Sequence, residues 1–208
     1  MKVGVLALQG AFREHIRMLR ELGAEAVEIR LPAGLDEVDG LIIPGGESTT
    51  MRKLMADFGL VEPLREFAAS GKPVFGTCAG LIVMAERLGG RRQELLNLID
   101  IDVERNAYGR QVDSREADIS SDALGPEPFH AVFIRAPRIL STGPGVEPLA
   151  RYRGRVVLAR QNNILVAAFH PELTGDARVH KLFLQLFDRK ARSLNRTGGY
   201  STPREKTA

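Results

Sequence analysis

Cys78 is the only cysteine of this 208-residue chain, and its neighbours are those that a nucleophile needs. It lies in Gly-Thr-Cys-Ala-Gly, between an apolar run and a helical pattern, with Gly76 and Gly80 flanking it at two residues on either side. A nucleophile on a sharp strand-to-helix turn has a strained backbone, which side chains at those flanking positions would crowd. The turn exposes the sulfur at a helix N-terminus, where the dipole favours a thiolate, and aims the Ala79 N–H at an oxyanion. The pattern predicts a cysteine nucleophile; the alternative is a small buried cysteine.

A thiolate nucleophile needs a base, and the base needs a group that orients it. His170 ends an apolar strand pattern, and Pro171 stops further strand pairing there. In an extended chain Glu172 lies on the same side as His170, so its carboxylate can hold the imidazole in one tautomer. We therefore expect His170 as the base and Glu172 as its partner; the alternative is a strand-end histidine beside a surface glutamate. Structural or surface roles are expected for the other three histidines, His15, His130 and His180.

The segment LIIPGGEST, at residues 41–49, is a third candidate for the site. An apolar strand pattern ends there in Pro-Gly-Gly, and the glycines allow backbone N–H groups to approach a ligand closely. Ser48 or Thr49 is predicted to cap the helix that follows. The alternative is a tight turn followed by a helix cap.

The elements that position these residues follow two patterns. In the first half, strand and helix patterns alternate, which predicts an α/β fold with a parallel sheet between helices. Strands are predicted at 2–8, 26–31, 40–44 and 72–78, and helices at 11–23, 48–58, 60–70 and 79–88. The second half has strand-like segments at 98–104, 129–135, 154–160 and 164–169, and a closing helix at 177–190. We expect these strands to extend the same sheet in an antiparallel or mixed way.

Composition and charge restrict the classes of protein. Residues 1–190 are predicted to form one domain, followed by a polar and mobile tail at 191–208. One cysteine and no long apolar run predict a cytoplasmic protein, and the apolar opening is interpreted as a buried strand rather than a signal peptide. The net charge is +3 and the isoelectric point about 9.2, without a basic block that contains aromatic residues, so nucleic-acid binding is disfavoured.

Together these motifs resemble the class I (triad) glutamine amidotransferases, and among them the family of glutaminase subunits of pyridoxal 5′-phosphate synthase. The matching segments occur in that family's order over residues 2–188: GVLALQGAFREH, PGGEST, GTCAGL, ERNAYGRQ, FIRAP and FHPELTGDARVH. Two positions depart from the pattern. Tyr108 stands where the family more often has phenylalanine, and Arg115 stands where an aromatic residue is expected. Arg115 bears on a local surface or subunit contact rather than on the chemistry.

The resemblance implies a flavodoxin-like three-layer α/β/α fold, with a mixed sheet and a parallel core. It implies that Cys78 is the nucleophile, that His170 is the base and then the acid, and that Glu172 orients His170. Backbone N–H groups of Gly46 and Ala79 would stabilise the oxyanion. The positions that the resemblance assigns to L-glutamine binding are Gly46, Glu47, Ser48, Arg105, Ile134 and Arg135.

The implied activity is hydrolysis of L-glutamine to L-glutamate and ammonia through a cysteine thioester. The ammonia would pass to a (β/α)₈-barrel synthase subunit in a heteromeric complex. No metal and no cofactor are expected on this subunit, since pyridoxal 5′-phosphate would be the product of the complex. Two alternatives stay open. One is a glutaminase subunit of another synthase, such as imidazole glycerol phosphate synthase, against which ALQGAFREH and RNAYGRQ argue. The other is a non-catalytic regulatory subunit, against which the intact Cys-His-Glu set argues.

Overall fold

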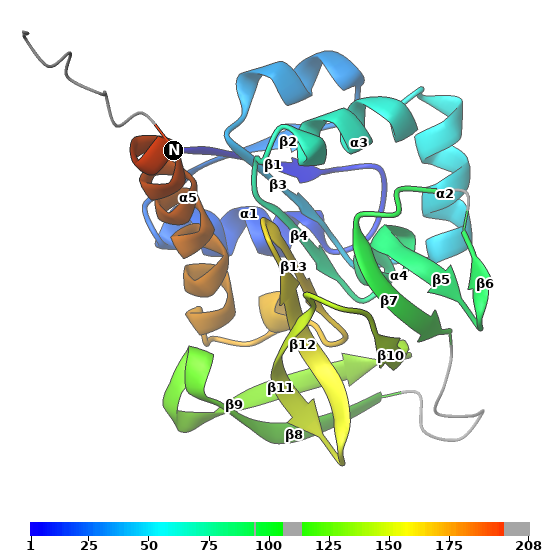
Figure 1. Ribbon diagram of the computed structural model, residues 1–208, viewed down its shortest axis with the longest axis vertical. Helices are drawn as coiled ribbons and strands as arrows, with labels where there is room; N and C mark the ends of the chain where they lie inside the picture. The colour runs from blue at the N-terminus through cyan, green and yellow to red at the C-terminus, as the bar shows by residue number, and fades with distance from the viewer. Residues whose placement is uncertain (94, 106–113, 198–208) are drawn as a thin grey trace, which may run out of the picture.

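The computed structural model describes residues 1–93, 95–105 and 114–197, with side chains as far as Asp188 (Figure 1). Its centre is a seven-stranded sheet in the order β11-β12-β13-β4-β3-β1-β2. The parallel strands are β1 (Lys2–Leu6), β2 (Glu25–Ile29), β3 (Gly40–Ile43), β4 (Val74–Thr77) and β13 (Ile164–Ala167). Antiparallel pairing adds β12 (Arg155–Gln161) and β11 (Glu147–Tyr152). This confirms the predicted mixed sheet with a parallel core.

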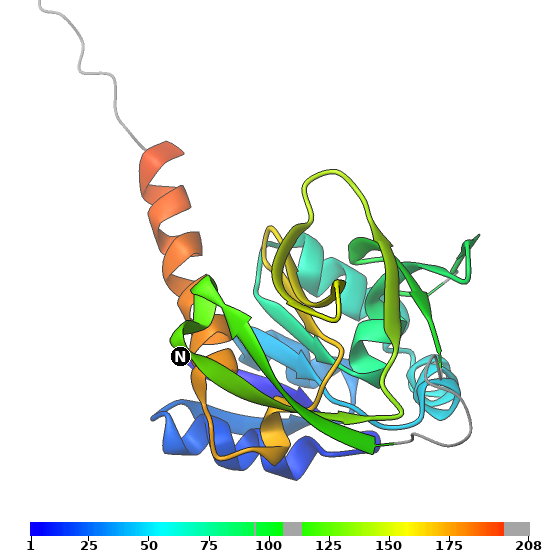
Figure 2. The same cartoon turned by 90° about the horizontal axis from the view of Figure 1, so that it is seen from below.

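Helices cover both faces of the sheet, which gives three layers (Figures 1 and 2). One face is covered by α1 (Phe12–Glu21) and α5 (Arg178–Thr197), the other by α2 (Ser48–Asp57), α3 (Val61–Ala69) and α4 (Ala79–Met84). Successive strand side chains point to opposite faces. Phe75 of β4 therefore packs on Phe183 of α5, with ring centroids 5.6 Å apart. The next residue, Gly76, faces Met84 of α4.

The prediction that all later strands extend the main sheet was wrong for two of them. Residues 98–104 form β7 (Ile99–Glu104), which lies in a four-stranded sheet ordered β10-β7-β5-β6. Its other strands are β10 (Arg138–Thr142), β5 (Ala85–Leu88) and β6 (Arg91–Arg92). Residues 129–135 belong mainly to β9 (Gly125–Ile134), which pairs only with β8 (Ser114–Ser121) among the described strands.

The helix predicted at 79–88 was also too long. It ends at Met84, and Ala85 is already extended, at φ −64° and ψ 146°. The amide of Gln93 donates to the carbonyls of Ile82 and Ala85, at 3.0 Å each. These bonds satisfy carbonyls that the helix leaves open, so the chain can turn directly into β5.

At the C-terminal side of the described chain, helix α5 is longer than predicted. It runs to Thr197, so residues 191–197, expected in a mobile tail, are helical. The rest of that tail, 198–208, lies outside the described residues, and the domain boundary at 190 stays a prediction. Within the described ranges the chain also forms the short 3₁₀ helices η1 (Pro32–Glu37), η2 (Asp122–Leu124) and η3 (Pro171–Leu173).

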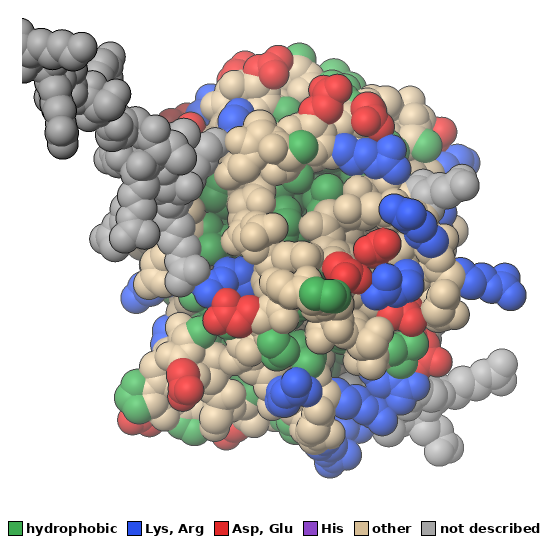
Figure 3. All heavy atoms as spheres, viewed as in Figure 1, with side chains coloured by type: hydrophobic (Ala, Val, Ile, Leu, Met, Phe, Trp, Pro, Cys, Tyr) green, Lys and Arg blue, Asp and Glu red, His purple; other side chains and the backbone are tan. Residues whose placement is uncertain are grey.

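None of the helices in the described ranges is long and apolar enough to cross a membrane. Over much of the face shown in Figure 3, lysine and arginine side chains are interspersed with acidic ones. Mixed charge of this kind is typical of an ordinary solvated surface.

Candidate active site

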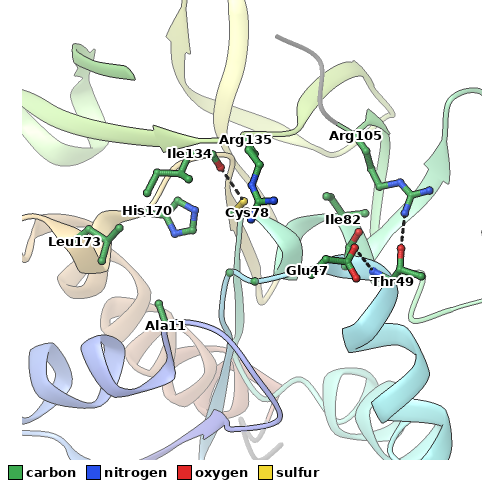
Figure 4. Close-up of a pocket in the computed structure, with 13 residues that line it drawn as sticks. Ala11, Glu47, Thr49, Cys78, Ile82, Arg105, Ile134, Arg135, His170 and Leu173 are labelled. Atoms are coloured by element: carbon green, nitrogen blue, oxygen red, sulfur yellow. Dashed lines mark hydrogen bonds between the residues drawn. The ribbon is translucent and has the colours of Figure 1, made fainter. Parts of the chain in front are cut away.

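A pocket of about 540 Å³ lies at the carboxyl edge of the main sheet. Gly45 and Gly46 follow β3, Cys78 follows β4, and His170 follows β13. Because these strands are parallel neighbours, their carboxyl ends meet at one edge, where open α/β sheets bind ligands. The predicted site residues that line the pocket are Gly46, Glu47, Ser48, Cys78, Arg105, Ile134, Arg135 and His170 (Figure 4). Ala79 and Glu172 do not line it: they are buried directly behind it.

Cys78 lies on the sharp turn that its flanking glycines predicted. Its backbone is at φ 49° and ψ −103°, a conformation that side-chain-bearing residues rarely adopt. A Cβ on Gly80 would lie 2.0 Å from the carbonyl oxygen of Ile43, and one on Gly76 would lie 2.5 Å from Sδ of Met84. The neighbouring backbone therefore leaves no room for a larger residue at either position. The Cys78 N–H donates to the carbonyl of Ala167 at 2.9 Å, which ties the turn to β13.

His170 and Glu172 make the predicted contact, but not through the expected extended backbone, because Glu172 lies in the 3₁₀ helix η3. Nδ1 of His170 lies 2.7 Å from Oε1 of Glu172, and the carboxylate is fully buried. The other ring nitrogen is left for Cys78, which lies beside this imidazole (Figure 4). Burial alone would lower the pKa of His170, but the contacts with Cys78 and Glu172 outweigh it and raise the pKa to about 10. The imidazole therefore binds a proton strongly at this position.

Gly45, in the loop after β3, lies at a point where a side chain would not fit. A Cβ there would lie 2.4 Å from Cε1 of His170 and 3.4 Å from Cβ of Cys78. The loop backbone thus passes directly beside both side chains, within reach of any group bound between them.

Ile134 and Arg135, at the end of β9, cover the sulfur from the other side (Figure 4). The Cys78 thiol donates to the carbonyl of Ile134, with 3.7 Å between sulfur and oxygen. Arg135 has a positive φ of 43°, which is strained for a residue with a side chain. Arg135 lines the pocket, and its guanidinium has the charge and shape to pair with a carboxylate.

Glu47, not Ser48 or Thr49, caps helix α2, so the predicted cap was wrong. The Glu47 carboxylate accepts from the backbone N–H groups of Thr49 at 2.9 Å and Thr50 at 2.7 Å. These hydrogen bonds lower the pKa of Glu47 to about 2. A glutamate reaches the same donors with its longer side chain and adds a full negative charge at the helix N-terminus. The pocket therefore has a fixed carboxylate on one wall.

Gln9 also binds the loop that contains Gly46 and Glu47, and this contact was not predicted from the sequence. Its Oε1 accepts from the Glu47 N–H at 3.1 Å, and its Nε2 donates to the Glu47 carbonyl at 3.0 Å. A Cβ on Gly46 would lie 2.4 Å from that amide. On the far side of the loop, the Arg105 guanidinium donates to Thr49 Oγ1 at 3.0 Å. The glutamine in ALQGAFREH was the available signal, since a polar residue directly follows a buried strand there.

His15 and His180 also lie near the site, although neither lines the pocket. Both are fully buried, and Nε2 of His15 is 3.4 Å from Oε2 of Glu172. Each histidine lies in the apolar stripe of its helix, beside Ile16 or Val179 in the sequence. A histidine within an apolar stripe was the sequence pattern that could have predicted their burial. His130 is about half exposed, as expected for a surface histidine.

Two further predictions concern the positions that depart from the family's pattern. Arg115 lies in β8, opposite Phe133 of β9. Tyr108 lies outside the described residues. Within the described part of the chain, no three His, Cys, Asp or Glu side chains form a group that could hold a metal ion.

Comparison with known proteins identifies the family. A family model described as "SNO glutamine amidotransferase family" matches residues 5–189. A relative from Pelotomaculum thermopropionicum is 58% identical over 185 residues, covering 89% of this chain and 94% of the relative. One from Bacillus velezensis is 54% identical over 189 residues, covering 91% and 96%. Both are named pyridoxal 5′-phosphate synthase subunit PdxT.

Solved structures agree with this. A crystal structure of a glutamine amidotransferase superimposes with a TM-score of 0.83 at 48% identity, covering 89% of this chain and 98% of the other. The structure of PurLQS from Thermotoga maritima superimposes with a TM-score of 0.65 at 16% identity, covering 91% and 98%, which shows a shared fold.

Proposed function

This chain belongs to the SNO glutamine amidotransferase family, and we propose that it is the glutaminase subunit of a pyridoxal 5′-phosphate synthase. It hydrolyses L-glutamine to L-glutamate and ammonia, and the ammonia is used to make pyridoxal 5′-phosphate. The observation that carries this proposal is the geometry at Cys78: a thiol on a strained turn, beside a histidine whose far nitrogen is bonded to a buried carboxylate.

In the first half of the reaction, His170 holds the proton of the Cys78 thiol, and the Cys78 thiolate attacks the side-chain carbonyl carbon of glutamine. The carbonyl oxygen becomes an oxyanion, which the backbone N–H groups of Ala79 and Gly46 stabilise. His170 then gives its proton to the leaving nitrogen. The C–N bond breaks, ammonia departs, and a γ-glutamyl thioester remains on Cys78.

In the second half, His170 removes a proton from water, and the resulting hydroxide attacks the thioester carbonyl. The C–S bond breaks, glutamate is released, and the proton returns to the cysteine sulfur. Glu172 remains ionised throughout: burial would raise its pKa, but its contacts with His15 and His170 outweigh burial and lower the pKa of Glu172. Its charge keeps Nδ1 of His170 protonated and stabilises the imidazolium between the steps.

The pocket provides complementary groups for both ends of an amino acid. The guanidinium groups of Arg105 and Arg135 suit the α-carboxylate of glutamine, and the fixed carboxylate of Glu47 suits its α-ammonium group. Gly46, Ser48 and Ile134 complete the proposed contacts. Since the reaction uses only side-chain and backbone groups, it needs neither a metal nor a cofactor on this subunit.

Ammonia must reach its acceptor without becoming ammonium in bulk water, since ammonium is not nucleophilic. The relatives are named as subunits of a synthase, which supports a partner chain as the acceptor. We assign that role to a (β/α)₈-barrel synthase subunit in a heteromeric complex, and the compartment to the cytoplasm, where a lone thiol stays reduced.

The experiment is release of ammonia from L-glutamine, measured with and without the synthase subunit, for the wild type and for His170→Asn. We expect activity in the wild-type complex and little in the variant. An inactive wild-type complex would support a regulatory subunit instead. Pull-down identifies the synthase: recovery of a histidine-pathway enzyme instead of the barrel subunit would contradict the assignment.

A further inference from the structure

Two buried histidines continue the line of polar groups behind Glu172. Oε1 of Glu172 accepts from His170, while Oε2 lies 3.4 Å from Nε2 of His15. Among the described residues, Oε2 has no hydrogen-bond partner, so the 3.4 Å approach of His15 Nε2 is an electrostatic contact rather than a hydrogen bond. Nε2 of His15 is also 3.2 Å from Thr77 Oγ1, and its Nδ1 is 2.8 Å from Nε2 of His180. The order from the pocket inward is thus Cys78, His170, Glu172, His15 and His180.

Elementary electrostatics selects one tautomer for each of these rings. A proton on Nε2 of His15 points toward the negative oxygen of Glu172 and toward Thr77 Oγ1, whereas a lone pair there would be repelled by the carboxylate. Nδ1 of His15 is then an acceptor, so His180 must donate to it from Nε2. This leaves Nδ1 of His180, which has no partner within the described structure, as a bare lone pair. With the opposite tautomers, Nδ1 of His180 would instead carry a buried N–H without a partner, which costs more free energy than a bare lone pair.

The surroundings of both rings favour their neutral form. Each is 0% exposed, and burial lowers the pKa of His15 and lowers that of His180 well below the ordinary value. Phe75 packs edge-on against both, at interplanar angles of 86° and 85°. A neutral donor behind Glu172 orients the carboxylate but leaves its full negative charge for His170. A second imidazolium there would compete for that charge.

We infer that His15 is a positioning residue of the reaction: its Nε2–H holds Oε2 of Glu172, so that Oε1 stays directed at His170, and His180 fixes the tautomer in which His15 can donate. The inference rests on the proposed glutaminase activity for its kinetic consequence. A free Glu172 carboxylate can rotate about its last torsion and misalign the imidazole. The pair therefore acts on the rate of the chemical steps and leaves the glutamine-binding groups unchanged.

Matched variants separate positioning from packing. His15→Leu removes the donor, whereas His15→Gln keeps an N–H the same number of bonds from Cβ as Nε2. In the complex with the synthase subunit, we expect His15→Leu to lower kcat about 10- to 100-fold, the size of one donor contact to a charged group, with KM changed less than about twofold. His15→Gln should recover most of kcat. Phe183→Leu, which changes a buried ring packed on Phe75 and removes no hydrogen-bond donor, should reduce stability and leave kcat within about twofold.

A spectroscopic measurement tests the same inference without turnover. In wild-type protein with ¹⁵N-labelled histidine, His15 and His180 should both be neutral Nε2–H tautomers between about pH 6 and 8. The low-field proton signal of the His170–Glu172 hydrogen bond should weaken in His15→Leu and persist in His15→Gln.

Three results would overturn the inference: wild-type kcat in His15→Leu, equal losses in the two His15 variants, or an Nδ1–H tautomer at His15. If His15→Leu does not fold, the glutamine variant and the wild-type spectra still decide. If the wild-type complex releases no ammonia, the proposed function fails, while the tautomers continue to test the arrangement behind Glu172.

Discussion

His170 and His130 each hydrogen-bond carboxylates, yet only one of the two is placed to do chemistry. His170, at the edge of the main sheet, shares one nitrogen with Glu172 and keeps the other for Cys78. His130, on the β8–β9 hairpin, has both nitrogens occupied, at 3.0 Å from Asp118 and 3.0 Å from Glu116. Both imidazoles have a raised pKa.

Both histidines have acidic partners. The two regions differ instead in how deeply the imidazole is buried and in whether one of its ring nitrogens is left for a nucleophile. The His170 side chain is 9% exposed and that of His130 is 52% exposed. Water and salt screen the contacts of His130, whereas those of His170 act at full strength. A raised histidine pKa therefore identifies a catalytic group only when one ring nitrogen faces a nucleophile inside a closed pocket.

The largest expected effect tests the His170 region at its nucleophile. Cys78→Ala should lower glutamine-dependent activity about 10⁴-fold or more, because the thioester cannot form. Activity with added ammonia should persist in the complex, since this bypasses the glutaminase. Ammonia release from glutamine and product formation with ammonium salts are the two assays. Loss of both activities would mean that the substitution disturbs the complex instead.

The second prediction compares the two histidines directly. His170→Asn should lower ammonia release about 10²- to 10⁴-fold, the usual contribution of a general acid–base group. His130→Asn should stay within about twofold of the wild type in the same assay. Comparable losses in the two variants would show that the hairpin takes part in the reaction.

The third prediction compares one glycine from each region. Ala at Gly80 would place its Cβ 2.0 Å from the Ile43 carbonyl, so Gly80→Ala should destabilise the fold by about 1–3 kcal/mol and reduce ammonia release. Gly125 begins β9 at φ +96° with open space around it. Gly125→Ala should cost about 1–2 kcal/mol from backbone strain alone and leave the activity unchanged. Thermal unfolding measures the loss of stability in both variants, and initial rates of ammonia release measure their activity.

The smallest expected effect is the pH dependence of stability at His130. Hydrogen bonds to Asp118 and then Glu116 raise its pKa above the ordinary value of 6.5. Stabilisation from these contacts is therefore complete below about pH 6.5 and is lost as the pH rises through the raised value. His130→Gln should remove this part of the Tm profile, and high salt should reduce it in the wild type. A Tm difference that grows with pH would contradict this sign.

The sequence predicted the central α/β region well, because the patterns that define its strands and helices each lie within a short segment of the chain. Apolar runs, alternation of strands and helices, and the glycines around Cys78 were sufficient for the parallel core and the elbow. The second half was harder, because strand pairing there is not encoded locally. β7 pairs with β5 only because α4 stops at Met84, and that end depends on the amide of Gln93, which bonds back to the helix.

The candidate site divides in the same way. The contact between His170 and Glu172 joins residues two positions apart, so the sequence was enough to predict it, although the chain turns into a 3₁₀ helix there instead of staying extended. The contact between His15 and His180 joins residues 165 positions apart, and no local pattern indicates it. Glu47 was missed as a helix cap because shorter side chains are the usual caps. Gln9 was missed because its partners belong to another loop.

The unbroken burial of residues 73–85 has a consequence for exchange with solvent. Backbone N–H groups in such a segment exchange with deuterium only when the whole domain opens. We expect the amides around Cys78 to belong to the slowest class of the protein, while that of the exposed residue Gly46 exchanges quickly. The nucleophile thus lies in the most protected part of the chain, and the loop on the opposite wall of the pocket lies in contact with solvent.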